Sequence, residues 1–253
     1  MNLQHFIAEF VGTAILILLG NGVVANVALR RTLGGGAGWI VITLGWGMAV
    51  FVAVMCVAKF SGAHLNPAVT VAMAFNNQGG FTWGDAPTYI VAQLLGAFVG
   101  AVLVFLYYGD HFEATDDANT KFGCFSTAPA IRNLPRAFFC EVVGTFLLVF
   151  PIFLMVAPTF ALPGAGTEGQ EIANGFGALG ALPVGLLVFA IGMSLGGTTG
   201  YAINPARDLG PRIAHALLPI RGKRDSDWGY AWIPVVAPLT GALLAALAAR
   251  GLV

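Results

Sequence analysis

A tripeptide that occurs twice is the first feature of this sequence that suggests chemistry. Proline is favoured at the first position of a helix and asparagine just before it, so each copy predicts a helix N-terminus. The asparagine oxygen can cap the helix while its NH2 group donates hydrogen bonds to a solute hydroxyl. One copy alone would predict only a cap, but a matched pair predicts function. The copies are Asn66-Pro67-Ala68 and Asn204-Pro205-Ala206.

Ionisable residues inside apolar segments are the second feature. Arg207 follows Asn204 by three residues, and a charge in such a segment predicts a functional site. Glu9 and Glu141 occupy equivalent places in two similar segments. Proton relay is one interpretation, but the symmetry favours carboxylates that accept hydrogen bonds from backbone N–H groups of a nearby loop. Asp208 is predicted to be a buried partner of arginines.

The remaining chemical candidates are weak. His64 suggests a metal or a proton relay, but no second ligand-type residue lies near it, so a structural role is favoured. Cys56, Cys124 and Cys140 lack metal-ligand spacing and indicate no disulfide framework. No Ser/His/Asp arrangement, His-Glu-x-x-His motif or pair of catalytic carboxylates is present. We therefore expect no enzyme, no cofactor and no metal site.

The composition shows where these residues must be placed. Of 253 residues, 57% are hydrophobic and 9% are charged, whereas a soluble domain has roughly a quarter charged. The net charge of zero argues against nucleic-acid binding. A bilayer core needs about 20 apolar residues per helix. The chain is therefore predicted to be an all-α polytopic membrane protein with six transmembrane helices, at Phe6–Ala28, Trp39–Ala58, Pro87–Tyr108, Ala137–Val156, Ala178–Leu195 and Ala231–Ala248.

Two shorter apolar segments, Pro67–Phe75 and Pro205–Leu218, each begin with proline and are predicted to be re-entrant half-helices. Their approaches, Ser61–Leu65 and Gly196–Ile203, are glycine-rich. Non-helical backbone at membrane depth is tolerated only where protein buries it or it lines a watery cavity. A channel or cavity is therefore expected.

The chain also repeats itself. Glu9–Thr13 resembles Glu141–Thr145, Gly62–Ala68 resembles Gly200–Ala206, and the pair Gly96-Ala97 recurs as Gly241-Ala242. Three crossings in each half make the repeats inverted, so the half-helices meet from opposite faces. We expect one channel domain over residues 1–253, with repeats at about 6–108 and 136–251, a connecting loop at about 109–135, and a Gly-rich acidic loop at 161–177.

Opposed half-helix N-termini predict a pore that repels cations and protons, because each macrodipole places roughly half an elementary charge there. The backbone carbonyls before each half-helix are then the expected acceptors for a file of hydroxylated solutes. These carbonyls belong to Gly62, Ala63, His64 and Leu65 in the first repeat, and to Gly200, Tyr201, Ala202 and Ile203 in the second.

With these motifs, the sequence resembles the aquaporin superfamily over nearly its whole length. The resemblance implies the aquaporin fold, a homotetramer, and a selectivity filter at Trp46, Gly192, Tyr201 and Arg207. Water-selective relatives usually carry histidine at the position of Gly192, so glycine indicates a wider pore. Tyr201 departs from the phenylalanine that is more usual in bacterial glycerol facilitators. Residues that match the glycerol-conducting branch are Asp208, Arg212, Pro234 and the segment Phe125–Pro129.

The function so implied is a passive channel for glycerol, small polyols and some water, which excludes ions and protons and lies in the lipid bilayer of a bacterial inner (plasma) membrane. A water-selective aquaporin is one alternative. An ion-coupled secondary transporter with inverted repeats is another, but it would need a titratable midplane site. The family places both termini in the cytoplasm. Most loop arginines would then lie outside, against the positive-inside rule.

Overall fold

The computed structural model describes residues 2–155, 159–160, 172–173 and 177–252. These residues form α-helices, two short 3-10 helices and one two-residue antiparallel strand pair. The elements are α1 (Leu3–Ala28), α2 (Trp39–Ser61), α3 (Pro67–Phe75), η1 (Gln78–Gly80), α4 (Ala86–Tyr107), α5 (Gly109–Ala114), α6 (Ala118–Gly123), α7 (Leu134–Leu154), β1 (Thr159–Phe160), β2 (Ile172–Ala173), η2 (Gly177–Ala181), α8 (Leu182–Leu195), α9 (Pro205–Leu217) and α10 (Ile233–Arg250).

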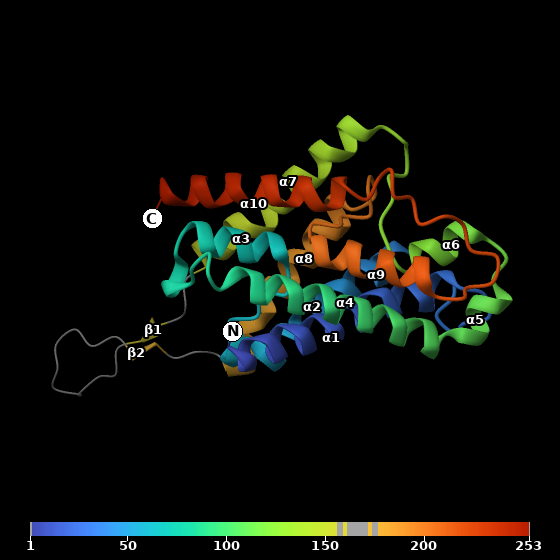
Figure 1. The fold of residues 1–253 in the computed structure, drawn as a ribbon, viewed down its shortest axis with the longest axis horizontal. Coiled ribbons are helices and arrows are strands. Elements are labelled where there is room, and N and C mark those ends of the chain that lie inside the picture. The colour runs from blue at the N-terminus through green and yellow to red at the C-terminus, as the bar shows by residue number, and fades with distance from the viewer. Residues whose placement is uncertain (1, 156–158, 161–171, 174–176, 253) are drawn as a thin grey trace.

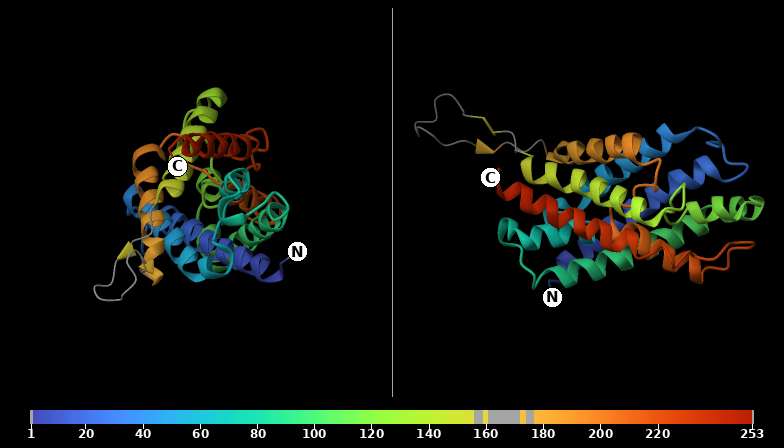
Figure 2. Two further views of the ribbon diagram at one scale, coloured as in Figure 1. Left: turned by 90° about the vertical axis from the view of Figure 1, so that its left-hand side faces the viewer. Right: turned by 90° about the horizontal axis from the view of Figure 1, so that it is seen from above.

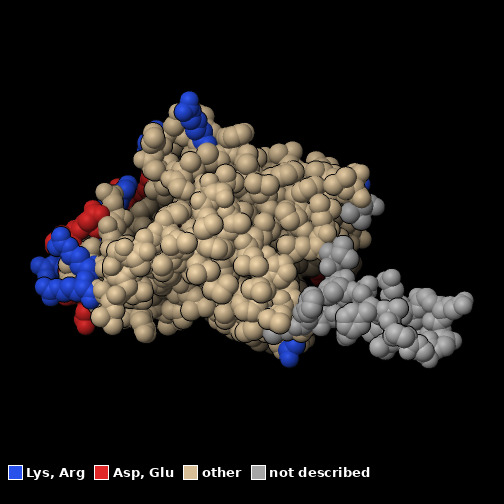
Figure 3. Space-filling view, turned by 180° about the vertical axis from the view of Figure 1, so that it is seen from behind, with Lys and Arg blue, Asp and Glu red and all other residues tan. Residues whose placement is uncertain are grey.

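The predicted fold class is confirmed. Within the described residues, α1, α2, α4, α7 and α10 are long and apolar enough to cross a bilayer. Their outward faces expose large apolar side chains such as Leu19, Leu103 and Leu244. On the face seen in Figure 3, charged side chains gather at the end that carries α5 and α6, and the body between the two ends is almost free of them. This distribution suits a belt of lipid.

Most helix ends differ from the prediction by a few residues, and two regions differ more. The fifth span is shorter, because α8 has 14 residues and begins only at Leu182, next to Pro183, after the 3-10 turn η2. The predicted loop at about 109–135 contains α5 and α6, and Asp117 caps α6 by accepting from the N–H groups of Asn119 and Thr120. Val156 and, apart from β2 and Gly177, the predicted Gly-rich loop at 161–177 lie outside the described residues.

Small residues bring the long helices together in the same way in both halves. A Cβ on Gly96 of α4 would lie 2.3 Å from the carbonyl oxygen of Phe10 on α1. A Cβ on Gly241 of α10 would lie 2.3 Å from the carbonyl oxygen of Val142 on α7. Only glycine allows these backbones to approach so closely, which is a common way to pack helices in lipid.

The half-helices α3 and α9 lie inside this frame, each packed against the last long helix of the opposite half. α3 contacts α10, and α9 contacts α4. Figure 1 shows α3 and α9 among the long helices, and in Figure 2 both chain termini lie at the end opposite α5 and α6. The frame therefore holds two short helices whose beginnings meet inside the molecule.

Candidate functional site

The chain before each half-helix has an unusual backbone. In the first loop, Gly62, Ala63 and Leu65 have φ angles of 80°, 52° and 52°. In the second, Gly200, Tyr201 and Ile203 have φ angles of 82°, 39° and 42°. Left-handed residues other than glycine cost about 1–3 kcal/mol each, so surrounding contacts must hold them.

Glu9 supplies those contacts for the first loop. It is fully buried, and its carboxylate accepts hydrogen bonds from the backbone N–H groups of His64 at 3.0 Å and Leu65 at 2.7 Å. The Ser61 hydroxyl donates to it at 2.6 Å and the Gln93 amide at 2.7 Å. All four donors converge on one side chain, which fixes the loop to α1.

Glu141 does the same for the second loop. It is also fully buried and accepts from the N–H groups of Ala202 at 2.9 Å and Ile203 at 2.8 Å. Neither glutamate is among the residues that line the inner cavity described below. Their geometry matches support of the re-entrant loops.

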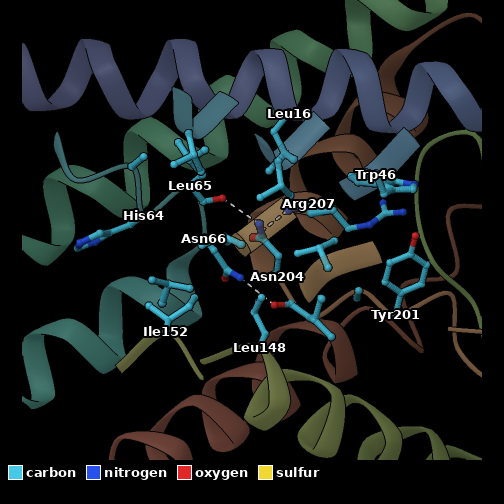
Figure 4. Close-up of a pocket in the computed structure, with 18 of the residues that line it drawn as sticks. Leu16, Trp46, His64, Leu65, Asn66, Leu148, Ile152, Tyr201, Asn204 and Arg207 are labelled. Atoms are coloured by element: carbon cyan, nitrogen blue, oxygen red, sulfur yellow. Dashed lines mark hydrogen bonds between the residues drawn. The ribbon is translucent and has the colours of Figure 1, made fainter. Parts of the chain in front are cut away.

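The two asparagines cap the half-helices and also cross-link the loops. Asn66 Oδ1 accepts from Ala68 N, and Asn204 Oδ1 accepts from Ala206 N, both at 2.9 Å. Their NH2 groups donate across to the other loop (Figure 4). Asn66 Nδ2 lies 2.8 Å from the carbonyl oxygen of Ile203, and Asn204 Nδ2 lies 2.8 Å from the carbonyl oxygen of Leu65.

Each asparagine side chain therefore donates one N–H to a carbonyl of the opposite loop and retains a second N–H. Both asparagines line the same inner cavity, so the remaining N–H groups are available to its contents. The carbonyls of Leu65 and Ile203, expected as pore acceptors, each already accept one bond and keep one lone pair.

The inner cavity has a volume of about 150 Å³ and two unlike walls. One wall consists of the loops 62–66 and 201–204, which present backbone and amide groups. The other consists of apolar side chains that individual sequence positions could not identify, because they are aliphatic residues on uniformly apolar helices. These are Leu16, Val50, Val54, Val69, Met73, Leu148, Ile152, Val184 and Val188.

A second cavity of about 350 Å³, called the outer cavity below, lies toward the α6 end. Trp46, Tyr201 and Arg207 line both cavities, so they stand between the two. The Arg207 guanidinium lies 4.0 Å from the centre of the Trp46 ring, and its Nη1 donates to the carbonyl of Phe125 at 3.3 Å. Arg207 is only 7% exposed. The structure thus brings three of the four predicted filter residues together at the constriction between the two cavities.

Gly192, the fourth predicted filter residue, lines neither of these cavities. A Cβ at this position would lie 2.8 Å from Tyr201 Cζ and 2.9 Å from its hydroxyl oxygen. The space left by the missing side chain is therefore occupied by the phenol ring. Gly192 contributes by letting Tyr201 lie back against α8.

Asp208 forms its ion pair with Arg212. Their side chains are fully buried, with Arg212 Nε 2.7 Å from Asp208 Oδ1, and no ion pair joins Asp208 to Arg207 in the part of the chain that the structure describes. Asp208 also accepts from Thr127 N at 2.8 Å. This network holds the segment whose Phe125 carbonyl receives Arg207, a support that sequence reasoning missed although it noted Phe125–Pro129.

His64 lies on the inner cavity wall, where its Nδ1 is 3.3 Å from the Thr70 hydroxyl and its ring packs on Phe81 and Tyr89. Among the described residues, no group of three His, Cys, Asp or Glu side chains could hold a metal ion. The surroundings of His64 are those of a packed side chain.

The chain matches a known protein family. The model of the major intrinsic protein family matches residues 1–249. The chain belongs to this family. The family consists of channels and facilitators, which agrees with the expectation that the chain is not an enzyme.

Relatives in the family are similar over almost the whole chain. The probable glycerol uptake facilitator of Thermotoga maritima is 50% identical over 241 residues, covering 95% of this chain and 96% of that protein. The glycerol uptake facilitator of Bacillus subtilis is 51% identical over 236 residues, covering 93% and 80%. The X-ray structure of the aquaglyceroporin from Plasmodium falciparum aligns with a TM-score of 0.79 at 34% identity, covering 98% and 95%. The resemblance to the aquaporin superfamily is confirmed.

If Arg207 forms part of the barrier to cations, Arg207→Val should raise the proton leak of reconstituted vesicles by about three- to tenfold, because a buried positive charge at the constriction is removed while the half-helix dipoles remain. A pH-sensitive dye inside the vesicles measures the leak. Arg224→Val is the matched control, since Arg224 lines the outer cavity but not the constriction. A folded Arg207→Val protein with the parent's leak would remove Arg207 from the barrier.

Proposed function

We propose that this chain is a passive channel that conducts glycerol and other small neutral solutes, with some water. The observation that carries the proposal is the pair of asparagine amides, which donate crosswise between two re-entrant loops and line one cavity. The relatives named as glycerol uptake facilitators support the choice of solute.

The cavity suits a molecule with two unlike edges. Hydroxyl groups can exchange hydrogen bonds with the loop carbonyls and asparagine amides, while a carbon chain lies against the aliphatic wall. Such pockets are mostly apolar with a few placed polar groups that fix orientation. A glycerol molecule fits this division better than an ion, whose hydration shell would have to be replaced on all sides.

The two alternative functions receive less support. A coupled transporter needs a titratable group that is free to bind the coupling ion. Apart from the Tyr201 phenol, the described residues that line the inner cavity include only Arg207 and His64 as ionisable side chains, and the His64 ring is packed on Phe81 and Tyr89. A water-selective pore would need a narrower constriction, whereas Gly192 lets Tyr201 lie back against α8.

The proposal extends to membrane, orientation and assembly. We place the protein in a bacterial plasma membrane as a homotetramer, with both termini in the cytoplasm and the α5 and α6 end outside. The cations at that end conflict with the positive-inside rule, in which acidic residues count little, so the orientation rests on the resemblance to the family; several of these cations are paired with acids. These pairs are Arg30 with Asp116, Arg132 with Asp227, and Arg224 with Asp225.

The function is tested with purified protein in liposomes. Glycerol uptake, followed by stopped-flow light scattering, should rise almost linearly with concentration and should not respond to an imposed proton gradient or membrane potential, because no carboxylate lines the inner cavity to couple solute to an ion. Vesicles without protein give the background. Accumulation of glycerol above equilibrium would favour the transporter, and water flux without glycerol flux would favour the water channel.

A further inference from the structure

Trp39, the first residue of α2, lies against two of the proposed filter residues from the outer side. Its indole Nε1 donates to the carbonyl oxygen of Gly192 at 3.0 Å. Its ring packs edge-on against Tyr201, with centroids 6.0 Å apart and an interplanar angle of 74°. Trp39 also lines the outer cavity. It is therefore in direct contact with the constriction.

Trp39 belongs to a continuous face of α2. Residues 39, 43 and 46 have the i, i+4, i+7 spacing that places side chains on one side of a helix. Thr43 Cγ2 would lie 3.0 Å from a Cβ on Gly192, and the Arg207 guanidinium lies over the Trp46 ring. This face of α2 covers the filter from end to end, with Trp39 at the outer end.

Packing alone fixes the Tyr201 ring. Its hydroxyl is buried and has no hydrogen-bond partner within the described residues. A Cβ on Gly196 would lie 2.4 Å from Tyr201 Cδ1 and 2.9 Å from Trp39 Cζ2, and a Cβ on Gly192 would also collide with the ring. The ring is thus held between two glycines and the edge of the indole. In Figure 4 its hydroxyl points toward Arg207, so the position of the ring determines the opening.

We propose that Trp39 is a positioning residue that sets the size limit for solutes by holding the Tyr201 ring against α8. This inference rests on the proposed function, since a size limit matters only where solutes pass. Without the indole, the ring can move into the vacated volume, and the opening between Tyr201 and Arg207 becomes wider.

The test measures permeability to water, urea, glycerol and the four-carbon polyol erythritol in liposomes that contain the parent or a variant. Trp39→Ala should raise the erythritol-to-glycerol permeability ratio at least about threefold, an effect of the size seen between directly coupled residues. Trp39→Leu, which fills volume without an aromatic edge, should raise it too. Trp39→Phe, which keeps an edge on Tyr201, should stay within about twofold of the parent.

Two controls separate positioning from general loosening. Trp83→Ala removes an exposed tryptophan from the segment between η1 and α4 and should leave the ratio unchanged. In a Tyr201→Ala background, Trp39→Ala should add nothing, because it acts through that ring. An unchanged size series in folded Trp39→Ala and Trp39→Leu proteins, or additive effects in the double variant, overturns the inference. A parent that conducts no glycerol refutes the proposed function instead, while a shift of the size limit between parent and variant still supports the role of Trp39.

Discussion

Replacing Gly192 with histidine is expected to reduce glycerol permeability at least about tenfold. A side chain at this position must displace Tyr201, since even a Cβ would lie 2.8 Å from Tyr201 Cζ. The Trp39 edge and the contact at Gly196 limit movement away from the pore, so the phenol is pushed toward Arg207. Overpacking of this kind costs about 1–3 kcal/mol in stability, so the phenol moves to relieve it. A displaced phenol that raises the barrier to glycerol by about 1.4 kcal/mol or more lowers its permeability at least about tenfold.

The measurement compares water and glycerol permeability on the same reconstituted protein by stopped-flow light scattering. Water is smaller than glycerol, so measurable water flux should remain. Tyr201→Phe is the matched control: it removes only a hydroxyl that has no partner among the described residues, and it should preserve or raise glycerol flux. If Gly192→His conducts glycerol as the parent does, the constriction has been assigned to the wrong place.

Much of the fold follows from local signals in the sequence. The half-helix α3 begins at Pro67 and ends at Phe75 as predicted, because Asn66 and Pro67 together specify a helix start. The beginning of α8 could not be placed in this way. Its approach is apolar and rich in glycine and alanine, and hydropathy does not distinguish an α-helix from a 3-10 turn there.

The site was harder to predict from the sequence than the fold, because its contacts join segments that are far apart in the chain. The hydrogen bond from Asn66 to Ile203 spans 137 positions, and that from Asn204 to Leu65 spans 139. The sequence indicated amides that donate into a pore, but not that each amide would donate one of its N–H groups to a carbonyl of the opposite loop. The partner of Asp208 was likewise ambiguous, since Arg207 and Arg212 both lie near it in sequence and only packing selects Arg212.

The double variant Glu9→Gln, Glu141→Gln is expected to lose about 2–6 kcal/mol of stability and most of its solute flux. An amide has only one acceptor oxygen. Whichever way the new amide at position 9 is turned, its NH2 group faces the N–H of His64 or of Leu65, and the new amide at position 141 faces that of Ala202 or of Ile203. Each unsatisfied buried donor costs about 1–3 kcal/mol.

The lost hydrogen bonds belong to loops whose backbone is already strained. Ala63, Leu65, Tyr201 and Ile203 have left-handed φ angles, so a loop that loses an anchor can relax toward ordinary backbone and move the asparagine amides out of register. Thermal unfolding in detergent measures the stability, and liposome assays measure the flux. Glu113→Gln, at an exposed position in α5, controls for the loss of a carboxylate. A double variant with the parent's stability and glycerol flux would show that something other than these two glutamates holds the re-entrant loops.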